Sequence, residues 1–211
     1  MPHRARACLF GILLILGTIP AAAQDAADRL IVPGQRAGAI GMATKPADLP
    51  RLYGAGNLKY GKADGSDEGV FEGIKLFAGT ADEFRVLLTR DRRQISFLRF
   101  ERPGGTWRTA EGIRVGLTPA ELEQIIGGPF RLYGFHWQYG GLVTLRDNPG
   151  RRLQKGLVIA FTPQRQASQA DEAEVSGDRL ISSRHPALER VGARIGVLIL
   201  NFRDRTWGGV N

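Results

Sequence analysis

The residues able to act as nucleophiles, bases or metal ligands are few and scattered. His136 and His185 lie far apart in the sequence, and neither has a neighbouring ligand pattern, whereas a metal site needs three or four converging ligands. Ser182 and Ser183 precede His185, but adjacency in sequence does not create a catalytic triad. The chain contains no Gly-x-Ser-x-Gly, Ser-x-x-Lys or His-Glu-x-x-His motif. The sequence therefore predicts no catalytic residue, no metal site and no cofactor.

Paired carboxylates leave one enzymatic alternative open. Asp67-Glu68 and residues 171–174 supply such pairs, both in polar sequence that is typical of loops. A glycosidase needs two carboxyl groups that the fold holds at a set separation, and the spacing in the sequence does not determine that separation. A cell-wall or carbohydrate hydrolase is therefore kept as the alternative function.

Residues 130–141 form the most unusual stretch of the chain, because aromatic residues occur there at every second position. Alternate side chains of a β-strand face opposite sides, so one face would carry Tyr133, Phe135, Trp137 and Tyr139. The stretch is either a central strand packed between two layers or an open aromatic face that binds a partner. Tyr and Trp are common interface anchors, and they also stack on sugar rings. With the flanking Arg131 and Arg146, these residues form the candidate partner-binding site.

The N-terminal segment has the pattern of an export signal. Arg4 and Arg6 precede an uncharged apolar run at 9–19, which is followed by a proline and three alanines. This order is typical of a cleavable secretory signal, and the run is shorter than the ~20 apolar residues of a spanning helix. We therefore expect a signal peptide over residues 1–23 and a periplasmic or secreted protein. The single cysteine, Cys8, would leave with the signal, so neither a lipid anchor nor a disulfide is expected.

The chain is basic, and arginine supplies most of the positive charge. Lys and Arg number 29 against 21 Asp and Glu, which gives a formal net charge of +8. The lysines are only Lys45, Lys59, Lys62, Lys75 and Lys155. Arginine forks suit carboxylates and phosphates, so an envelope protein or an anionic envelope polymer is the expected partner. The alternative is that these arginines cover a solvated surface. Nucleic acid is not expected as a partner of an exported protein.

A short motif occurs twice in the chain. Residues 46–54 read PADLPRLYG, and residues 119–127 read PAELEQIIG. The upstream residues 40–42 (IGM) likewise parallel residues 115–117 (VGL). A repeated supersecondary unit is the simplest explanation of this similarity.

Each copy of the motif carries the signals of a short helix. In the second copy Thr118 is a good N-cap, Pro119 suits the first helical position, and Glu121 completes a capping box. Gly127 is expected to end this helix. In the first copy Pro50 lies inside the helix, which predicts a shorter or distorted helix there.

The hydrophobic pattern changes to strand-like alternation after each helix. The expected strands are residues 69–77, 83–90, 94–101, 130–138, 141–146, 156–162 and 195–203. The polar residues 164–177 are expected to form a mobile loop, and His185-Pro186 a turn before a helix. The order of one helix followed by several strands occurs twice in the chain, and it predicts an α+β fold with antiparallel sheet. The two tandem units would span residues 24–108 and 109–211 and would pack together as one body.

Two openings carry a family resemblance. Residues 33–42 (PGQRAGAIGM), which precede the first helix, and residues 112–118 (GIRVGLT) resemble the broad group of exported β-lactamase inhibitor proteins and SmpA/OmlA-type assembly lipoproteins. The resemblance implies a helical hairpin packed against a small antiparallel sheet, two such units in tandem, and a binding role. This chain departs from both relatives, because it lacks the lipid-bearing cysteine of the lipoproteins and the disulfides of the inhibitors. No functional residue carries over.

These observations predict an exported soluble module that binds or has a structural role in the cell envelope. It would recognise an envelope protein or an anionic polymer, and it would have no membrane span after signal cleavage.

Overall fold

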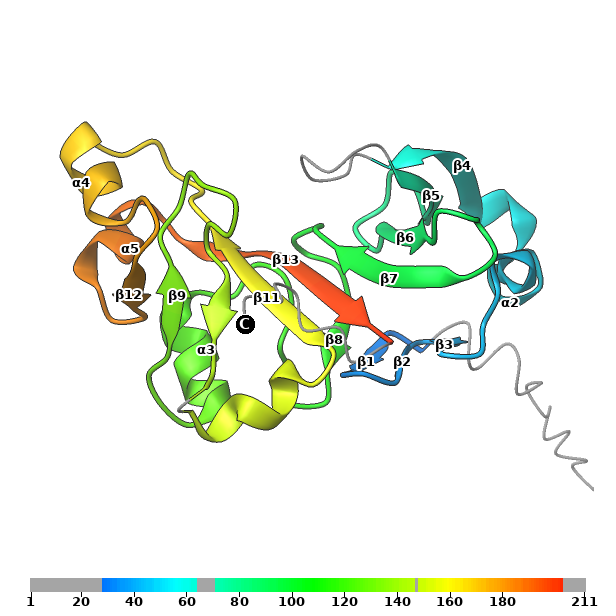
Figure 1. Cartoon of the computed structure of the whole chain (residues 1–211), viewed down its shortest axis with the longest axis horizontal. Helices are drawn as coiled ribbons and strands as arrows, with labels where there is room; N and C mark the ends of the chain where they lie inside the picture. The colour runs from blue at the N-terminus through cyan, green and yellow to red at the C-terminus, as the bar shows by residue number, and fades with distance from the viewer. Residues whose placement is uncertain (1–27, 64–70, 147, 203–211) are drawn as a thin grey trace, which may run out of the picture.

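The computed structural model describes residues 28–63, 71–146 and 148–202. This part of the chain is a mixed α+β fold with short helices and mostly antiparallel sheets (Figure 1). The predicted export signal over residues 1–23 lies outside the described residues. Among the helices of the described part, none has the length and apolar character needed to cross a membrane.

The largest sheet has six strands in the order β11-β13-β7-β6-β5-β4. Its strands are β4 (Leu58–Ala63), β5 (Phe71–Leu76), β6 (Phe84–Leu88), β7 (Ile95–Phe100), β11 (Leu157–Thr162) and β13 (Arg194–Asn201). β13 pairs with β7, with Leu198 opposite Phe100, and Figure 1 shows it running from one half of the molecule to the other. The sheet therefore continues across the boundary at 108/109 that the repeat predicts.

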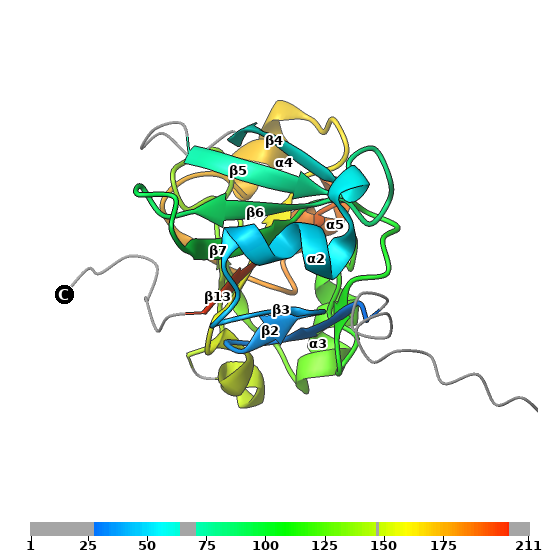
Figure 2. The ribbon, with the colours of Figure 1, turned by 90° about the vertical axis from the view of Figure 1, so that its right-hand side faces the viewer.

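The N-terminal residues form a small sheet in the order β3-β2-β1-β8. Its strands are β1 (Leu30–Val32), β2 (Arg36–Ala37), β3 (Ile40–Gly41) and β8 (Arg108–Thr109), and β1 and β8 are parallel. The following helix α2 (Leu49–Tyr53) lies over one face of the six-stranded sheet (Figure 2). Under it Phe84 packs against the rings of Tyr53, Phe100 and Trp107. These aromatic contacts make up the centre of the core in this half.

The third sheet and most of the helices belong to the C-terminal half. The sheet has the order β10-β9-β12, with strands β9 (Arg131–Tyr133), β10 (Val143–Thr144) and β12 (Leu180–Ser182). The helices are α3 (Pro119–Ile126), α4 (Gln169–Glu174), α5 (Pro186–Arg190) and the 3-10 helix η3 (Pro149–Gln154). Their apolar residues continue the hydrophobic core.

Both predicted helices form, and the ends of α3 follow the expected capping. In α3 the backbone N–H of Glu121 donates to the Thr118 hydroxyl at 3.2 Å, and Glu121 accepts from the backbone N–H of Thr118 at 2.7 Å. Gly127 ends the helix with φ 83° in the left-handed region. The first copy is a 3-10 turn, η1 (Pro46–Asp48), followed by the short α2. The distortion expected from Pro50 is therefore present.

One expected loop is partly helical. Residues 164–177 contain α4, so the prediction of a loop throughout this segment is wrong. Ser168 caps this helix, because its hydroxyl accepts from the backbone N–H of Asp171 at 3.1 Å. Asp171 and Glu174 both pair with Arg190, which fastens α4 to α5. The turn expected at His185-Pro186 is confirmed, since α5 starts at Pro186.

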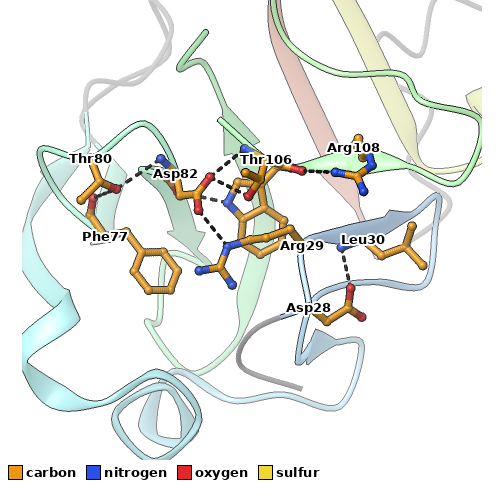
Figure 3. A network of polar contacts seen from close by, with 9 residues as sticks. Asp28, Arg29, Leu30, Phe77, Thr80, Asp82, Thr106 and Arg108 are labelled. Atoms are coloured by element: carbon orange, nitrogen blue, oxygen red, sulfur yellow. Dashed lines mark hydrogen bonds and ion pairs between the residues drawn. The ribbon is translucent and has the colours of Figure 1, made fainter. Parts of the chain in front are cut away.

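Asp82 joins the N-terminal sheet to the six-stranded sheet (Figure 3). Its carboxylate accepts from Nε of Arg29 at 3.1 Å and from the backbone N–H and hydroxyl of Thr106 at 2.7 and 2.9 Å. The guanidinium of Arg29 lies 4.5 Å from the ring centre of Phe77 and 5.0 Å from that of Trp107. These distances are those of cation–π contacts. One carboxylate thus holds three segments that are distant in the sequence.

Asp82→Asn is expected to lower the free energy of unfolding by about 1–3 kcal/mol at neutral pH, because a charged hydrogen-bond acceptor is lost. Burial raises the pKa of Asp82, but the hydrogen bonds from Thr106 and Arg29 outweigh burial, and the pKa is lowered. A lowered pKa stabilises the fold above the unfolded-state pKa of about 3.9. That stabilisation is lost as the pH falls further, through the folded-state pKa.

Urea denaturation from about pH 7 to about pH 2 measures this effect, and the difference between the native protein and Asp82→Asn should shrink on acidification. A matched control is Glu111→Gln, since Glu111 is exposed and makes no ion pair with a described residue. A difference that stays constant with pH would contradict the role assigned to the Asp82 charge.

Candidate anion-binding groove

The aromatic stretch does not form the long strand that its alternation predicts. β9 covers only Arg131–Tyr133, and extended structure cannot continue because His136 has a φ of 62°. The chain turns back instead, and the backbone N–H of Gly141 donates to the carbonyl of Tyr133 at 2.9 Å. The predicted strand over 130–138 and its single aromatic face are therefore wrong.

Phe135 is the predicted site residue that does not belong to the surface. Its side chain is only 3% exposed. Its backbone N–H donates to the carbonyl of Val175 at 2.7 Å, and its carbonyl accepts from the N–H of Gly177 at 2.9 Å. Gly134 permits this close crossing, because a Cβ there would lie 2.6 Å from the carbonyl oxygen of Gly177. Phe135 is therefore a core residue.

The other three aromatic residues do come together. Tyr133, Trp137 and Tyr139 form a group that we name the ring cluster, with ring centres separated by 5.5 Å for Tyr133–Trp137, 5.2 Å for Trp137–Tyr139 and 6.5 Å for Tyr133–Tyr139. Two of these contacts are edge-to-face, a favoured arrangement of aromatic pairs. All three side chains are half-buried, so part of each ring remains open to a ligand.

The outer face of the three-stranded sheet forms the floor of a hollow. Leu132 is fully buried, so strand alternation turns Arg131 and Tyr133 outward. The residues opposite these two in the neighbouring strands are Thr144, Leu180 and Ser182. With Arg146 they line a hollow of about 610 Å³. The structure thus brings Arg131, Tyr133 and Arg146 together around one hollow.

A second hollow of about 660 Å³ adjoins the first, because Arg146 and Asn148 line both. The other residues of its lining come from η3 and the residue after it, and they are Pro149, Arg151, Arg152 and Lys155. We name the two joined hollows the basic groove. It lies along the three-stranded sheet and the surface of η3.

The basic groove has a strong excess of positive charge. The cations that line it are Arg131, Arg146, Arg151, Arg152 and Lys155, and all are exposed. None of them forms an ion pair with a described residue, and no described carboxylate lines either hollow. Asp147 lies within this segment of sequence but outside the described residues. Exposed cations without acidic partners suit an anionic ligand.

Asn148 fixes the wall of the groove. Its Nδ2 donates to the carbonyls of Gly128 and Pro129 at 3.1 and 2.7 Å, and its Oδ1 accepts from the N–H of Gly150 at 2.6 Å. The side chain is only 8% exposed. It therefore caps η3 and anchors the turn that connects Arg146 to the cations of η3.

Sequence reasoning missed three of the groove cations, Arg151, Arg152 and Lys155. They follow Asn148-Pro149-Gly150, which reads as a hairpin turn, although the structure forms a 3-10 helix there. The available signal was a group of cations directly after a capping Asn-Pro pair. The position of these cations beside Arg131 depends on the register of the strands, which the sequence does not give.

A third hollow, of about 440 Å³, lies between α3 and α5, and its lining includes serine, histidine and glutamate side chains, the residue types that hydrolases use. The Ser183 hydroxyl donates to Oε1 of Glu123 at 2.5 Å and accepts from the backbone N–H of Phe130 at 3.0 Å. Nδ1 of His185 accepts from a backbone N–H at the start of α5 at 3.2 Å. Ser183, Glu123 and His185 are thus engaged in holding β9, β12 and α5, and no hydrogen bond joins Ser183 to His185.

Metal ligands do not cluster in the described part of the chain: no three His, Cys, Asp or Glu side chains there are placed to hold an ion. The groove cations would bind anions rather than a metal. Comparison of the chain with protein-family models, curated proteins and solved structures finds no match.

Proposed function

We propose that the protein is an exported binding module that recognises an anionic envelope polymer through the basic groove. One observation carries the proposal: five exposed cations without acidic partners among the described residues surround two joined hollows. A polyanion can place successive charges along such a groove. Each arginine can bind a phosphate or carboxylate through two parallel hydrogen bonds.

The ring cluster narrows the ligand class to anionic glycans. Tyr133 belongs both to the ring cluster and to the groove, so the rings stand beside the cations. The partly exposed Tyr and Trp rings offer flat apolar surface to a sugar, while the arginines hold its acidic groups. The phosphates of lipopolysaccharide and the carboxylates of cell-wall polymers both have this chemistry.

The proposal includes export of the protein to the cell envelope or beyond. The order of charge, apolar run and small residues in residues 1–23 favours export, which would bring the groove into contact with envelope polymers. The resemblance to exported tandem binding domains is consistent with the same role.

Isothermal titration of the chain from Gln24 with lipopolysaccharide tests the proposal, with neutral dextran as the uncharged comparison. We expect binding to lipopolysaccharide that weakens at least about tenfold between ~50 mM and ~500 mM salt, because salt screens exposed charges. Dextran should bind far more weakly. Equal affinity for both polymers, or an affinity independent of salt, would contradict the proposal.

The same samples separate binding from hydrolysis. A binding module leaves the length of the polymer unchanged after prolonged incubation. Of the carboxylates that suggest a hydrolase in the sequence, residues 67 and 68 lie outside the described residues, and Asp171 and Glu174 pair with Arg190. Two other carboxylates, Glu123 and Glu189, line the third hollow and give the hydrolase alternative a place to be tested. Shortening of a cell-wall polymer that disappears in Glu123→Gln would favour that alternative.

A further inference from the structure

Four cations stand side by side across neighbouring strands of the six-stranded sheet. The strand register places Lys59 opposite Lys75, Lys75 opposite Arg85, and Arg85 opposite Arg99. We name these four residues the cation row. Figure 2 shows their strands, β4 to β7, in this order. Directly opposite residues of antiparallel strands share a face, and like charges so placed destabilise a sheet. The arrangement therefore calls for compensating negative charge.

The cation row lies on the outer face of the sheet. Ile74, Val86 and Leu98 occupy the alternate positions and are at most 1% exposed, so their face packs in the core. Lys59 is exposed on the opposite face, while Lys75 and the two arginines are half-buried. A ligand can therefore reach the cation row from solvent. Because three of the four cations are partly buried, salt screens the charges of the row less than it screens fully exposed charges.

The described carboxylates compensate the row only in part. Glu101 pairs with Arg99 at 2.8 Å and more loosely with Arg85 at 3.6 Å. Lys59 and Lys75 make no ion pair with a described residue. Nε of Arg99 is buried and has no hydrogen-bond partner among the described residues.

Among the described residues, Glu83 is a further carboxylate close to the row, and it is already engaged. Glu83 is near enough to Lys75 to feel its charge, but it accepts from Nη2 of Arg102 at 3.2 Å and from the backbone N–H of Gly79 at 2.7 Å. Among the described residues, positive charge thus remains in excess along the row.

A small hollow lies at the β4 end of the row. Lys59, Lys75 and Arg85 line it, and Gly61 and Gly73, which face each other across β4 and β5, form its floor. A Cβ added to Gly61 would meet no atom within 4 Å, so the space above the floor is open. The volume of about 150 Å³ is that of about five water molecules in the liquid.

We propose that this hollow binds a phosphate group, either inorganic phosphate or a phosphomonoester. Three cations line a space of that size, and a compact dianion balances more of their charge than a carboxylate would. The two glycines leave the approach to the sheet free of side chains. This site is in the half of the protein opposite to the basic groove, and it does not rest on the function proposed for that groove.

Titration of the chain from Gln24 with inorganic phosphate, followed by amide NMR at constant ionic strength set with chloride, tests the site. We expect saturable shifts at Gly61 and Lys75 in the native protein. Gly61→Val should weaken phosphate binding at least tenfold, because the valine side chain would fill the hollow while suiting a β-strand. Lys75→Gln should weaken binding in the same direction.

Gly56→Val is the matched control. A Cβ at Gly56 likewise meets no atom within 4 Å, and Gly56 precedes β4, outside the hollow. This variant should bind phosphate as the native protein does. The proposal would be overturned if the native protein and Gly61→Val bound phosphate equally. It would also be overturned if the amide signals of Gly61 and Lys75 did not shift with any phosphate source.

Vesicles distinguish the two sources of the phosphate group. Phosphatidic acid displays a phosphomonoester, whereas phosphatidylglycerol displays only a phosphodiester. Binding of free phosphate supports a soluble ligand, and binding of phosphatidic acid alone supports a headgroup. In either case Arg146→Glu/Arg151→Glu in the basic groove should leave the response of Gly61 unchanged, so failure of one site can be told from failure of the other.

Discussion

Gly141→Ala is expected to lower the free energy of unfolding by at least about 3 kcal/mol, a loss reserved for severe backbone or core defects. Gly141 has a φ of 77°, which costs an L-residue about 1–2 kcal/mol. A Cβ there would overlap the carbonyl oxygen of Phe161 and lie 2.9 Å from its carbonyl carbon. The two backbone segments would have to separate to relieve this overlap. Separation would stretch the hydrogen bond that the N–H of Phe161 donates to the carbonyl of Gly141 at 2.9 Å. The substitution therefore strains the turn that holds the ring cluster.

Urea denaturation measures the loss, and Gly79→Ala separates its two causes. Gly79 has a φ of 84°, but a Cβ there meets no atom within 4 Å. Its replacement should cost only the conformational strain of about 1–2 kcal/mol. Equal losses in the two variants would show that the close approach of Gly141 to Phe161 does not matter.

The double variant Arg146→Glu/Arg151→Glu is expected to weaken lipopolysaccharide binding at least about 100-fold. A cation close to an anionic surface contributes about 1 kcal/mol, and reversing two of them replaces attraction by repulsion. A loss of about 2.8 kcal/mol corresponds to 100-fold in affinity. Stability should stay within about 0.5 kcal/mol, because both side chains are exposed and form no ion pair with a described residue.

Arg51→Glu/Arg90→Glu is the matched control for this variant. Both arginines are exposed, and neither lines the basic groove or the phosphate hollow. The change in net charge is identical, so only the position of the charges differs. Titration calorimetry should give near-native affinity for the control. An equal loss in both double variants would mean that net charge, rather than the groove, governs binding.

The sequence predicts the elements whose signals are local. Thr118, Glu121 and Gly127 define both ends of α3 within a few residues, and the structure has the same capping contacts. Five of the six strands of the large sheet follow from their hydrophobic alternation, but β4 (Leu58–Ala63) does not, because Tyr60, opposite the buried Ile74, is 67% exposed. α4 was missed since it has no buried residue, although the Ser168 cap was readable.

The aromatic stretch shows where local reasoning fails. Its alternation is that of a strand, but Gly134 lies against the backbone of residues 175–177 and His136 adopts a positive φ. The first of these features depends on a segment some 40 residues away in the chain, which no period-two pattern reveals. Phe135 is therefore buried, while its aromatic neighbours cluster at the surface.

The candidate site was predictable only in part. Arg131 and Arg146 flank the predicted aromatic face to which Tyr133 belongs, and all three residues line one hollow. Arg151 lies beside these residues because it belongs to η3, which Asn148 caps. The cation row was invisible, because its four residues lie on four strands and meet only through register.

Hydrogen–deuterium exchange of the chain from Gln24, with and without lipopolysaccharide, tests the central claim most directly. If the basic groove is the binding site, protection should be confined to residues 129–133, 144–155 and 180–182, and it should disappear in Arg146→Glu/Arg151→Glu. Protection centred instead on residues 118–123 and 183–194, around the third hollow, would contradict the assignment, as would binding without protection of any groove segment.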